Sequence, residues 1–181
     1  MRKFSFFISS ALAVVCLLSS CSQGLKGISK ASSRTLPYAK VDPIVTEAPA
    51  AHLVAAAHSK PKDRHNMPVY AFGERNRLVR TTAYTCSEDD HLPYGSANAF
   101  GTTLKYNNRV RSAAADWSFY PLGTVFKIKG QSPLYVVDDY GSALTGTGTI
   151  DIYHPTRDWM NAWGRRNVEI VVVQWGSLER S

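Results

Sequence analysis

Short apolar runs, separated by Gly, Pro or Ser, occupy the second half of the chain. Five runs are rich in β-branched and aromatic residues, and they cover residues 78–85, 124–129, 134–140, 149–154 and 168–175. Such runs predict β-strands. A helix is expected over residues 155–163, because a proline stands near its first turn, Asp158 lies at its positive end and Gly164 follows it. Many short strands with one helix predict a mainly β domain, built as a small barrel.

Two of the predicted strands each deliver an aspartate to a connection made of Gly, Ser and Thr. In residues 134–140, the period of two places Asp138 and Asp139 on opposite faces, so we expect one of them to face solvent. In residues 149–154, Asp151 shares a face with Tyr153. If both strands end at one rim of the barrel, Asp139 and Asp151 become neighbours. Two like charges held close together raise one pKa, as a general acid at neutral pH requires.

The amino terminus has the form of an export signal. Residues 2 and 3 are basic, and residues 4–18 are apolar but too short to span a bilayer, which needs about 20 residues. The signal ends in Leu18-Ser19-Ser20-Cys21, which resembles the lipobox of bacterial lipoproteins. This resemblance implies a signal peptide over residues 1–20, acylation of Cys21, and anchoring by several acyl chains. Ser22 after the cysteine is typical of outer-membrane lipoproteins that face the periplasm. The alternative is an ordinary secretory peptide with an incidental cysteine.

Composition divides the mature chain into a linker and a folded domain. Residues 21–78 are rich in Ala, Ser, Lys and Pro and predict a flexible, disordered tether, with a short helix around residues 52–58. Residues 79–181 are expected to form the one compact domain. Residues 22–80 hold ten basic and four acidic residues, whereas residues 81–181 hold nine basic and ten acidic ones. The basic charge therefore belongs mainly to the linker, which suits an anionic membrane or wall polymer and does not indicate a nucleic-acid-binding fold.

Cysteines and histidines give no sign of a disulfide framework or a metal site. Cys16 leaves with the signal and Cys21 is expected to be lipidated, so Cys86 is the one cysteine of the folded part. A nucleophilic Cys86 with a histidine partner is conceivable, but a packing role is favoured. The five histidines lack regular ligand spacing, and His91 lies in an acidic segment that favours a solvated turn. No metal and no cofactor is expected.

Several elements, in order, resemble the three-aspartate or 3D domain family. They are TTAYT, AAADWSFYPLGTVFKIKG, VVDDYGSALTGTGTIDIY and WGRRNVEIVVV, within residues 80–175. The resemblance implies a six-stranded double-psi β-barrel related to the catalytic domain of membrane-bound lytic transglycosylase A. Its three aspartates correspond to Asp116, Asp139 and Asp151, and Asp138 matches none of them. The sequence departs from the family after Asp139, where the loop lacks the usual lysine.

The resemblance also implies an activity on peptidoglycan. Asp151 is then the catalytic acid, Asp139 its electrostatic neighbour and Asp116 a supporting residue. The expected reaction is lytic cleavage of the β-1,4 bond between N-acetylmuramic acid and N-acetylglucosamine, with a 1,6-anhydro product. Aromatic residues near the rim are expected to contact the sugars: Tyr84, Tyr140 and Tyr153. The alternative is a non-catalytic peptidoglycan-binding or accessory lipoprotein.

Overall fold

The computed structural model describes residues 48–177. The predicted signal peptide, Cys21 and the first part of the predicted linker lie outside the described residues. The elements are α1 (Ala51–His58), β1 (Asn76–Tyr84), β2 (Val110–Ala115), β3 (Val125–Ile128), β4 (Leu134–Asp139), β5 (Ile150–Tyr153), α2 (Arg157–Trp163) and β6 (Arg166–Gln174), with short 3-10 helices at Leu92–Tyr94 and Ser142–Leu144. No helix within residues 48–177 is long and apolar enough to cross a membrane.

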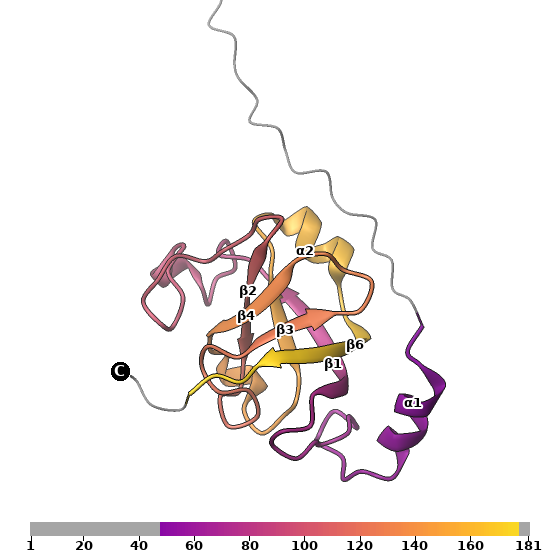
Figure 1. The fold of residues 1–181 in the computed structure, drawn as a ribbon. Coiled ribbons are helices and arrows are strands. Elements are labelled where there is room, and N and C mark those ends of the chain that lie inside the picture. The colour runs from indigo at the N-terminus through magenta and orange to yellow at the C-terminus, as the bar shows by residue number, and fades with distance from the viewer. Residues whose placement is uncertain (1–47, 178–181) are drawn as a thin grey trace, which may run out of the picture. The chain divides into compact units, whose positions relative to one another are not determined.

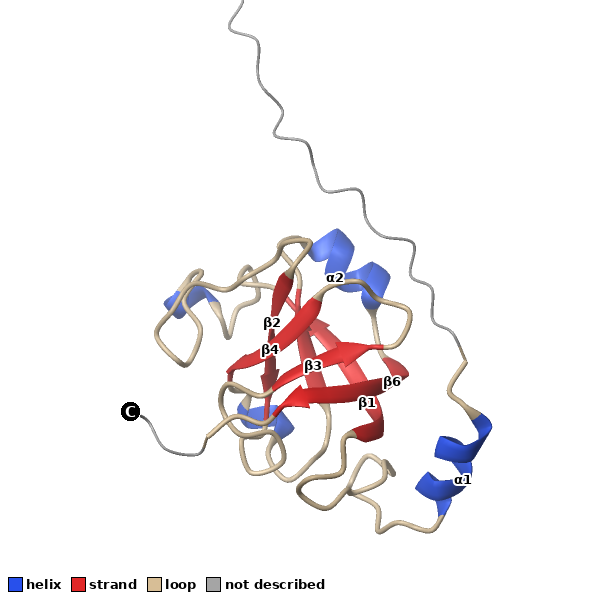
Figure 2. Ribbon diagram, viewed as in Figure 1, coloured by secondary structure: helices blue, strands red, loops and turns tan. Residues whose placement is uncertain are grey.

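The six strands close into a barrel in the order β1-β5-β2-β4-β3-β6 (Figures 1 and 2). The pairs β1/β5 and β2/β4 are parallel, and the other four pairs are antiparallel. This arrangement is consistent with a double-psi barrel, and it confirms the predicted mainly β class with six strands. Five strands coincide with the predicted runs to within two residues. The sixth, β2, has the sequence VRSAAA and was not predicted, because alanine has a low strand propensity.

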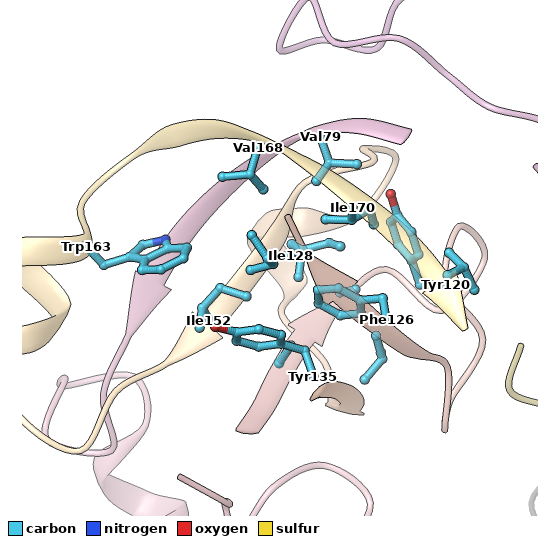
Figure 3. Packing of buried hydrophobic residues seen from close by; sticks show 14 residues of the cluster. Val79, Tyr120, Phe126, Ile128, Tyr135, Ile152, Trp163, Val168 and Ile170 are labelled. Atoms are coloured by element: carbon cyan, nitrogen blue, oxygen red, sulfur yellow. The ribbon is translucent and has the colours of Figure 1, made fainter. Parts of the chain in front are cut away.

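The barrel interior is filled by every second residue of its strands, as Figure 3 shows. Small side chains of β2, Ala113 and Ala115, are fully buried there, next to large ones from the neighbouring strands. This cluster includes Val79, Phe126, Ile128, Tyr135, Val137, Ile150, Ile152, Val168, Ile170 and Val172. The alanines of β2 therefore face inward beside bulkier neighbours, which gives an alanine-rich strand a packing role in the core.

A second cluster lies on the outer face of the same strands. Ala114, between the two inward-facing alanines, packs there with Tyr84, Leu104, Leu144 and Tyr153. Ala114 and Tyr153 alternate with the core residues Ala113, Ala115 and Ile152 along their strands, so these two members of the outer cluster obey the same period of two. This outer face carries the candidate site.

A bulge in β4 changes the predicted facing of its aspartates. Ala113 pairs with Val137, but the next residue, Ala114, pairs with Asp139, so Asp138 is the extra residue. Both carboxyls are buried: Asp138 is 3% exposed and Asp139 is 5% exposed. The expectation that one of them faces solvent was wrong. Strict alternation fails here because two residues of β4 oppose one residue of β2.

Part of the segment predicted as a linker is folded against the barrel. The helix predicted around residues 52–58 is present as α1, which lies near β1 (Figure 1). Leu53 and Tyr70 are buried, and the Asp63 carboxylate accepts hydrogen bonds from the backbone N–H groups of His65, Met67 and Gly148. Folded structure thus begins well before residue 79, and the described residues do not test the linker before residue 48.

The predicted helix after β5 is confirmed as α2. Thr156 is its N-cap and its side chain accepts a hydrogen bond from the backbone N–H of Trp159. Gly164 follows the last residue with a φ of 58°, a left-handed conformation that favours glycine. The cap and the glycine together fix where the chain turns into β6.

Candidate active site

Three adjacent strands place Asp139 and Asp151 on either side of one alanine. Ala114 of β2 pairs with Asp139 of β4 on one side and with Asp151 of β5 on the other. Asp151 in turn pairs with Thr82 of β1. Since neighbouring strands lie about 4.8 Å apart, the Cα atoms of the two aspartates are separated by roughly 9.6 Å. Ala114 has no side chain beyond Cβ, which leaves the space between the two carboxyls open.

Both aspartates line a cavity of about 200 Å³ on the outer face. Its wall also includes Tyr84, Glu88 and the 3-10 helix at Ser142–Leu144. A second cavity of about 410 Å³ shares Asp90, His91, Asp139, Tyr140, Gly141 and Ser142 with the first. The two cavities are therefore neighbouring parts of one groove. The predicted pair of carboxyls is brought together at a site with room for a ligand.

Asp151 is poised to hold a proton at neutral pH. Burial is the largest cause that raises the pKa of its carboxyl, and the charges of Glu88, Asp90 and Asp139 raise it further. A hydrogen bond with the Thr82 side chain acts in the opposite direction, and the pKa lies at about 7. Oδ1 of Asp151 is buried and has no hydrogen-bond partner among the described residues. A carboxylate oxygen that is buried without a hydrogen-bond donor disfavours the ionised form, in agreement with the raised pKa.

Asp139 accepts hydrogen bonds through both carboxylate oxygens. Tyr84 donates its hydroxyl to Oδ2 at 2.8 Å, and the backbone N–H groups of Ala99 and Tyr140 donate to Oδ1 at 2.8 and 2.9 Å. Burial, followed by the Asp139 charge, raises the pKa of Tyr84 above its ordinary value, so that hydroxyl keeps its proton. These donors fix the Asp139 carboxylate in place at the edge of both cavities.

Asp116 has a supporting position at the start of the turn after β2. Oδ1 accepts from the backbone N–H and the hydroxyl of Ser118, and Oδ2 accepts from the backbone N–H of Gly146 at 2.7 Å. Burial alone would raise its pKa, but these hydrogen bonds outweigh burial and lower it. Gly146 has a φ of 74°, which only glycine adopts readily. Asp116 thus ties the loop between β4 and β5 to the turn before β3.

We expect Asp116→Asn to destabilise the fold by about 1–3 kcal/mol at pH 7. The asparagine NH2 group replaces one carboxylate oxygen, and it cannot accept the hydrogen bond that a backbone N–H group donates there. Urea denaturation measures the change. The folded pKa of Asp116 lies below the ordinary value of 3.8, so its stabilisation is present above that pH and is lost as the pH falls through the folded pKa. Asp89→Asn, at an exposed position, is the control. Equal stability of both variants at pH 7 would contradict the supporting role.

Asp138 has a separate, structural set of contacts. Its Oδ2 accepts from the Lys105 ammonium group at 2.6 Å and from the Ser112 hydroxyl at 3.0 Å. Burial raises the pKa of Asp138, and the Lys105 hydrogen bond opposes that change. Asp138 lines neither of the two cavities. The distinction that the resemblance makes between the two adjacent aspartates agrees with this geometry.

The three tyrosines predicted to contact sugars are in different environments. Tyr140 is 43% exposed and lines both cavities, with its hydroxyl 2.9 Å from that of Thr145. Tyr84 is 8% exposed and is committed to Asp139. Tyr153 is 7% exposed and lines neither cavity. Of the three predicted positions, Tyr140 therefore offers an open ring, Tyr84 holds Asp139, and Tyr153 packs against Tyr84 in the outer cluster.

The loop between β1 and β2 contributes residues that the sequence did not assign to the site. Glu88, Asp90 and His91 line the cavity beside Asp151, although this acidic segment favoured a solvated turn. Tyr94 adds an aromatic ring, 67% exposed, at the wall of the larger cavity. The acidic run was visible in the sequence, but its position opposite Asp151 depends on how a 25-residue connection folds back over the barrel.

In the part of the chain that the structure describes, the groove holds neither a cluster of metal ligands nor the thiol of Cys86. Within residues 48–177, no group of three or more His, Cys, Asp or Glu side chains could hold a metal ion. Cys86 lies with its Sγ 3.7 Å from the Tyr153 hydroxyl, packs against the outer cluster, and lines neither cavity. The packing role favoured for Cys86 fits these contacts.

Part of the site lies in a segment that matches a known domain family. Residues 111–174 match the family model described as the 3D domain. The matched segment runs from β2 to β6 and contains all three aspartates of the site, whereas β1 and the acidic loop precede it. A comparison with curated proteins found no significant match.

Proposed function

Because residues 111–174 form a 3D domain, a family associated with lytic transglycosylase-like domains of the cell wall, we propose that this protein cleaves peptidoglycan glycan strands as a lytic transglycosylase. The observation that carries the proposal is a half-buried aspartate in the cavity wall, Asp151, whose pKa lies at about 7 and whose cavity is shared with a fixed second carboxylate, Asp139. A general acid needs a pKa near the working pH, and here burial supplies it.

The proposed reaction uses Asp151 twice. Its proton passes to the glycosidic oxygen as the bond from that oxygen to C1 of N-acetylmuramic acid breaks. The resulting carboxylate then takes the proton of the muramyl C6 hydroxyl while O6 bonds to C1 and closes the 1,6-anhydro ring. Asp151 is protonated again at the end, and no water is consumed. One titrating carboxyl therefore suffices, whereas hydrolysis by a glycosidase needs an acid and a second carboxylate as nucleophile or base.

Asp139 contributes charge and position in this scheme. Its carboxylate is held by Tyr84 and by two backbone N–H groups, so it cannot rotate to follow the substrate. A fixed negative charge beside the cavity stabilises the positive charge that develops on the sugar ring in the transition state. Because its oxygens already accept hydrogen bonds, Asp139 is a poor candidate for the proton donor.

Digestion of purified sacculi by the full-length protein, with the products resolved by mass spectrometry, tests this function. The proposal expects anhydromuropeptides, which are lighter by one water per cut than the products of a hydrolase. Products that carry the added water would replace the proposal with a hydrolase. Binding of sacculi without release of any product would favour the alternative, a non-catalytic wall-binding lipoprotein.

The proposed location rests on the sequence before the described residues. The lipobox-like Leu18-Ser19-Ser20-Cys21 supports an exported lipoprotein, and Ser22 supports the periplasmic face of the outer membrane. The partners would then be the membrane, through the acyl chains of Cys21, and the glycan strands of the wall. Metabolic labelling with a radioactive fatty acid tests the anchor: wild-type protein should be labelled and Cys21→Ala should not.

A further inference from the structure

A cationic pocket lies further along β1 from the candidate active site, since Arg80 lines this pocket whereas Ala83 and Tyr84 line the cavity of the site. It has a volume of about 360 Å³, and its lining includes Arg80 of β1, Arg166 of β6, Arg165 just before β6, and His65 from the loop after α1. No acidic side chain lines it. Three arginines line this hollow and no carboxylate does, which is the chemistry of an anion site.

Arg80 is the residue that this pocket leaves unsatisfied. Its Nε is buried and has no hydrogen-bond partner among the described residues. A buried guanidinium N–H without an acceptor is costly, and no acidic side chain of the pocket wall compensates the charge of Arg80. Arg166 is differently engaged, because it donates to the carbonyl oxygens of Ala162 and Trp163 at the end of α2. Arg165 is exposed at the mouth of the pocket.

One wall of the pocket is formed by His65, Asn66 and Met67, in the loop that precedes β1. Nδ1 of His65 lies 3.0 Å from the Thr149 hydroxyl, and the Asp63 carboxylate fastens the same loop to the barrel through the backbone N–H of Gly148. Burial, followed by the charge of Arg80, lowers the pKa of His65, while the Asp63 charge opposes this. A preformed pocket of this kind does not need to be ordered by its ligand.

Strand register relates the position of Arg80 in the pocket to that of Asp151. Thr82, whose side chain bonds Asp151, lies two residues after Arg80 in β1 and therefore on the same face. Two residues along a strand span about 7 Å. Thr149, which contacts His65, likewise lies two residues before Asp151. Arg80 of the pocket is thus one strand repeat from Thr82, the residue of β1 that pairs with Asp151.

We propose that this pocket binds a carboxylate carried by the sugar next to the cleaved bond, and so selects N-acetylmuramic acid over N-acetylglucosamine at that position. This inference rests on the proposed function for its substrate. In peptidoglycan the carboxylate has two sources. It belongs to the stem peptide when the lactyl group is substituted, and to the lactyl group itself when the peptide has been removed. N-acetylglucosamine carries neither.

Binding measured without cleavage separates this proposal from the proposed function. The full-length chain with Asp151→Asn is pelleted with intact sacculi, with amidase-stripped glycan strands, and with stripped strands whose carboxyls have been converted to methylamides. Arg80→Gln and Arg165→Gln are each added to this background. Arg109→Gln, at an exposed position before β2, is the matched control for loss of one guanidinium charge.

We expect Arg80→Gln and Arg165→Gln to weaken binding about tenfold, and Arg109→Gln to leave it unchanged, since a charge-assisted hydrogen bond is lost in the first two. A loss on intact sacculi alone assigns the carboxylate to the stem peptide, and a loss on stripped strands assigns it to the lactyl group. The methylamide strands should bind all variants equally weakly. If both pocket variants bind every charged strand as well as the control does, the proposal that this pocket binds a carboxylate is wrong, even if the wild-type protein cleaves peptidoglycan. Exposed Arg165 keeps the test valid if Arg80→Gln fails to fold.

Discussion

Asp151→Asn should abolish the release of anhydromuropeptides while leaving the binding of sacculi intact. General acid catalysis contributes about 10²–10⁴-fold to a rate. We expect a loss at the upper end of this range, because the proposed mechanism uses Asp151 first as acid and then as base. Asparagine has nearly the same shape and can keep a hydrogen bond with Thr82, so the cavity should persist. Product release over time, followed by mass spectrometry at pH 6–7, gives the rate.

The matched control is Asp158→Asn. Asp158 lies in the first turn of α2, is exposed, and lines neither cavity, so this variant loses the same charge away from the site. It should retain wild-type cleavage. If Asp151→Asn cleaves peptidoglycan at a rate within a few-fold of the wild type, Asp151 is not the acid and base of the reaction. Loss of binding together with activity would instead indicate a role in holding the substrate.

Asp151→Asn should also make the fold more stable than the wild type at high pH. The carboxyl has an ordinary pKa of 3.8 and a folded pKa of about 7. The native state therefore binds more protons than the unfolded state between these values, and the stability of the wild type falls as the pH rises through that window. The shift corresponds to a stability difference on the order of 4 kcal/mol. Asparagine, which does not titrate, escapes this loss.

Urea denaturation of both proteins at pH 4 and at pH 8 measures this effect. At pH 4, near the unfolded pKa, the free energies of unfolding should differ little. At pH 8 the variant should be more stable by several kcal/mol, since the wild type must then bury an ionised carboxylate near Glu88, Asp90 and Asp139. Active sites commonly keep a functional residue that lowers the stability of the fold. A difference that is the same at both pH values would show that Asp151 has an ordinary pKa.

The strand pattern predicted most of the fold, and its failures have specific physical causes. β2 escaped notice because three consecutive alanines have little strand propensity, and only the large residues packed against them explain why they form a strand. Apart from the helix around residues 52–58, the folding of residues before 79 onto the barrel was missed, because its anchors, such as the hydrogen bonds from backbone N–H groups to Asp63, are single polar contacts without periodicity. Local pattern does not contain such tertiary contacts.

The proximity of Asp139 and Asp151 was predictable from the sequence, but the electrostatics around them was not. The pair Asp139 and Asp151 followed from two strand ends and a glycine-rich loop, yet Asp139 reaches the outer face through a bulge that strict alternation does not provide. The raised pKa of Asp151 was expected mainly from the nearby charge of Asp139, with both groups partly out of water. In the structure burial is the largest cause, and Glu88 and Asp90 precede Asp139 among the charges. Their position depends on a long loop whose path the sequence pattern did not show.

Whether Asp151 holds a proton at neutral pH is tested most directly by titration of its carboxyl carbon. The full-length protein is labelled with ¹³C at aspartate side-chain carboxyls, and the Asp151 resonance is identified by its absence from Asp151→Asn. We predict a titration midpoint near pH 7. A midpoint close to 4 would mean that the carboxyl is ionised at neutral pH and cannot serve as the proton donor, and the proposed mechanism would then be wrong.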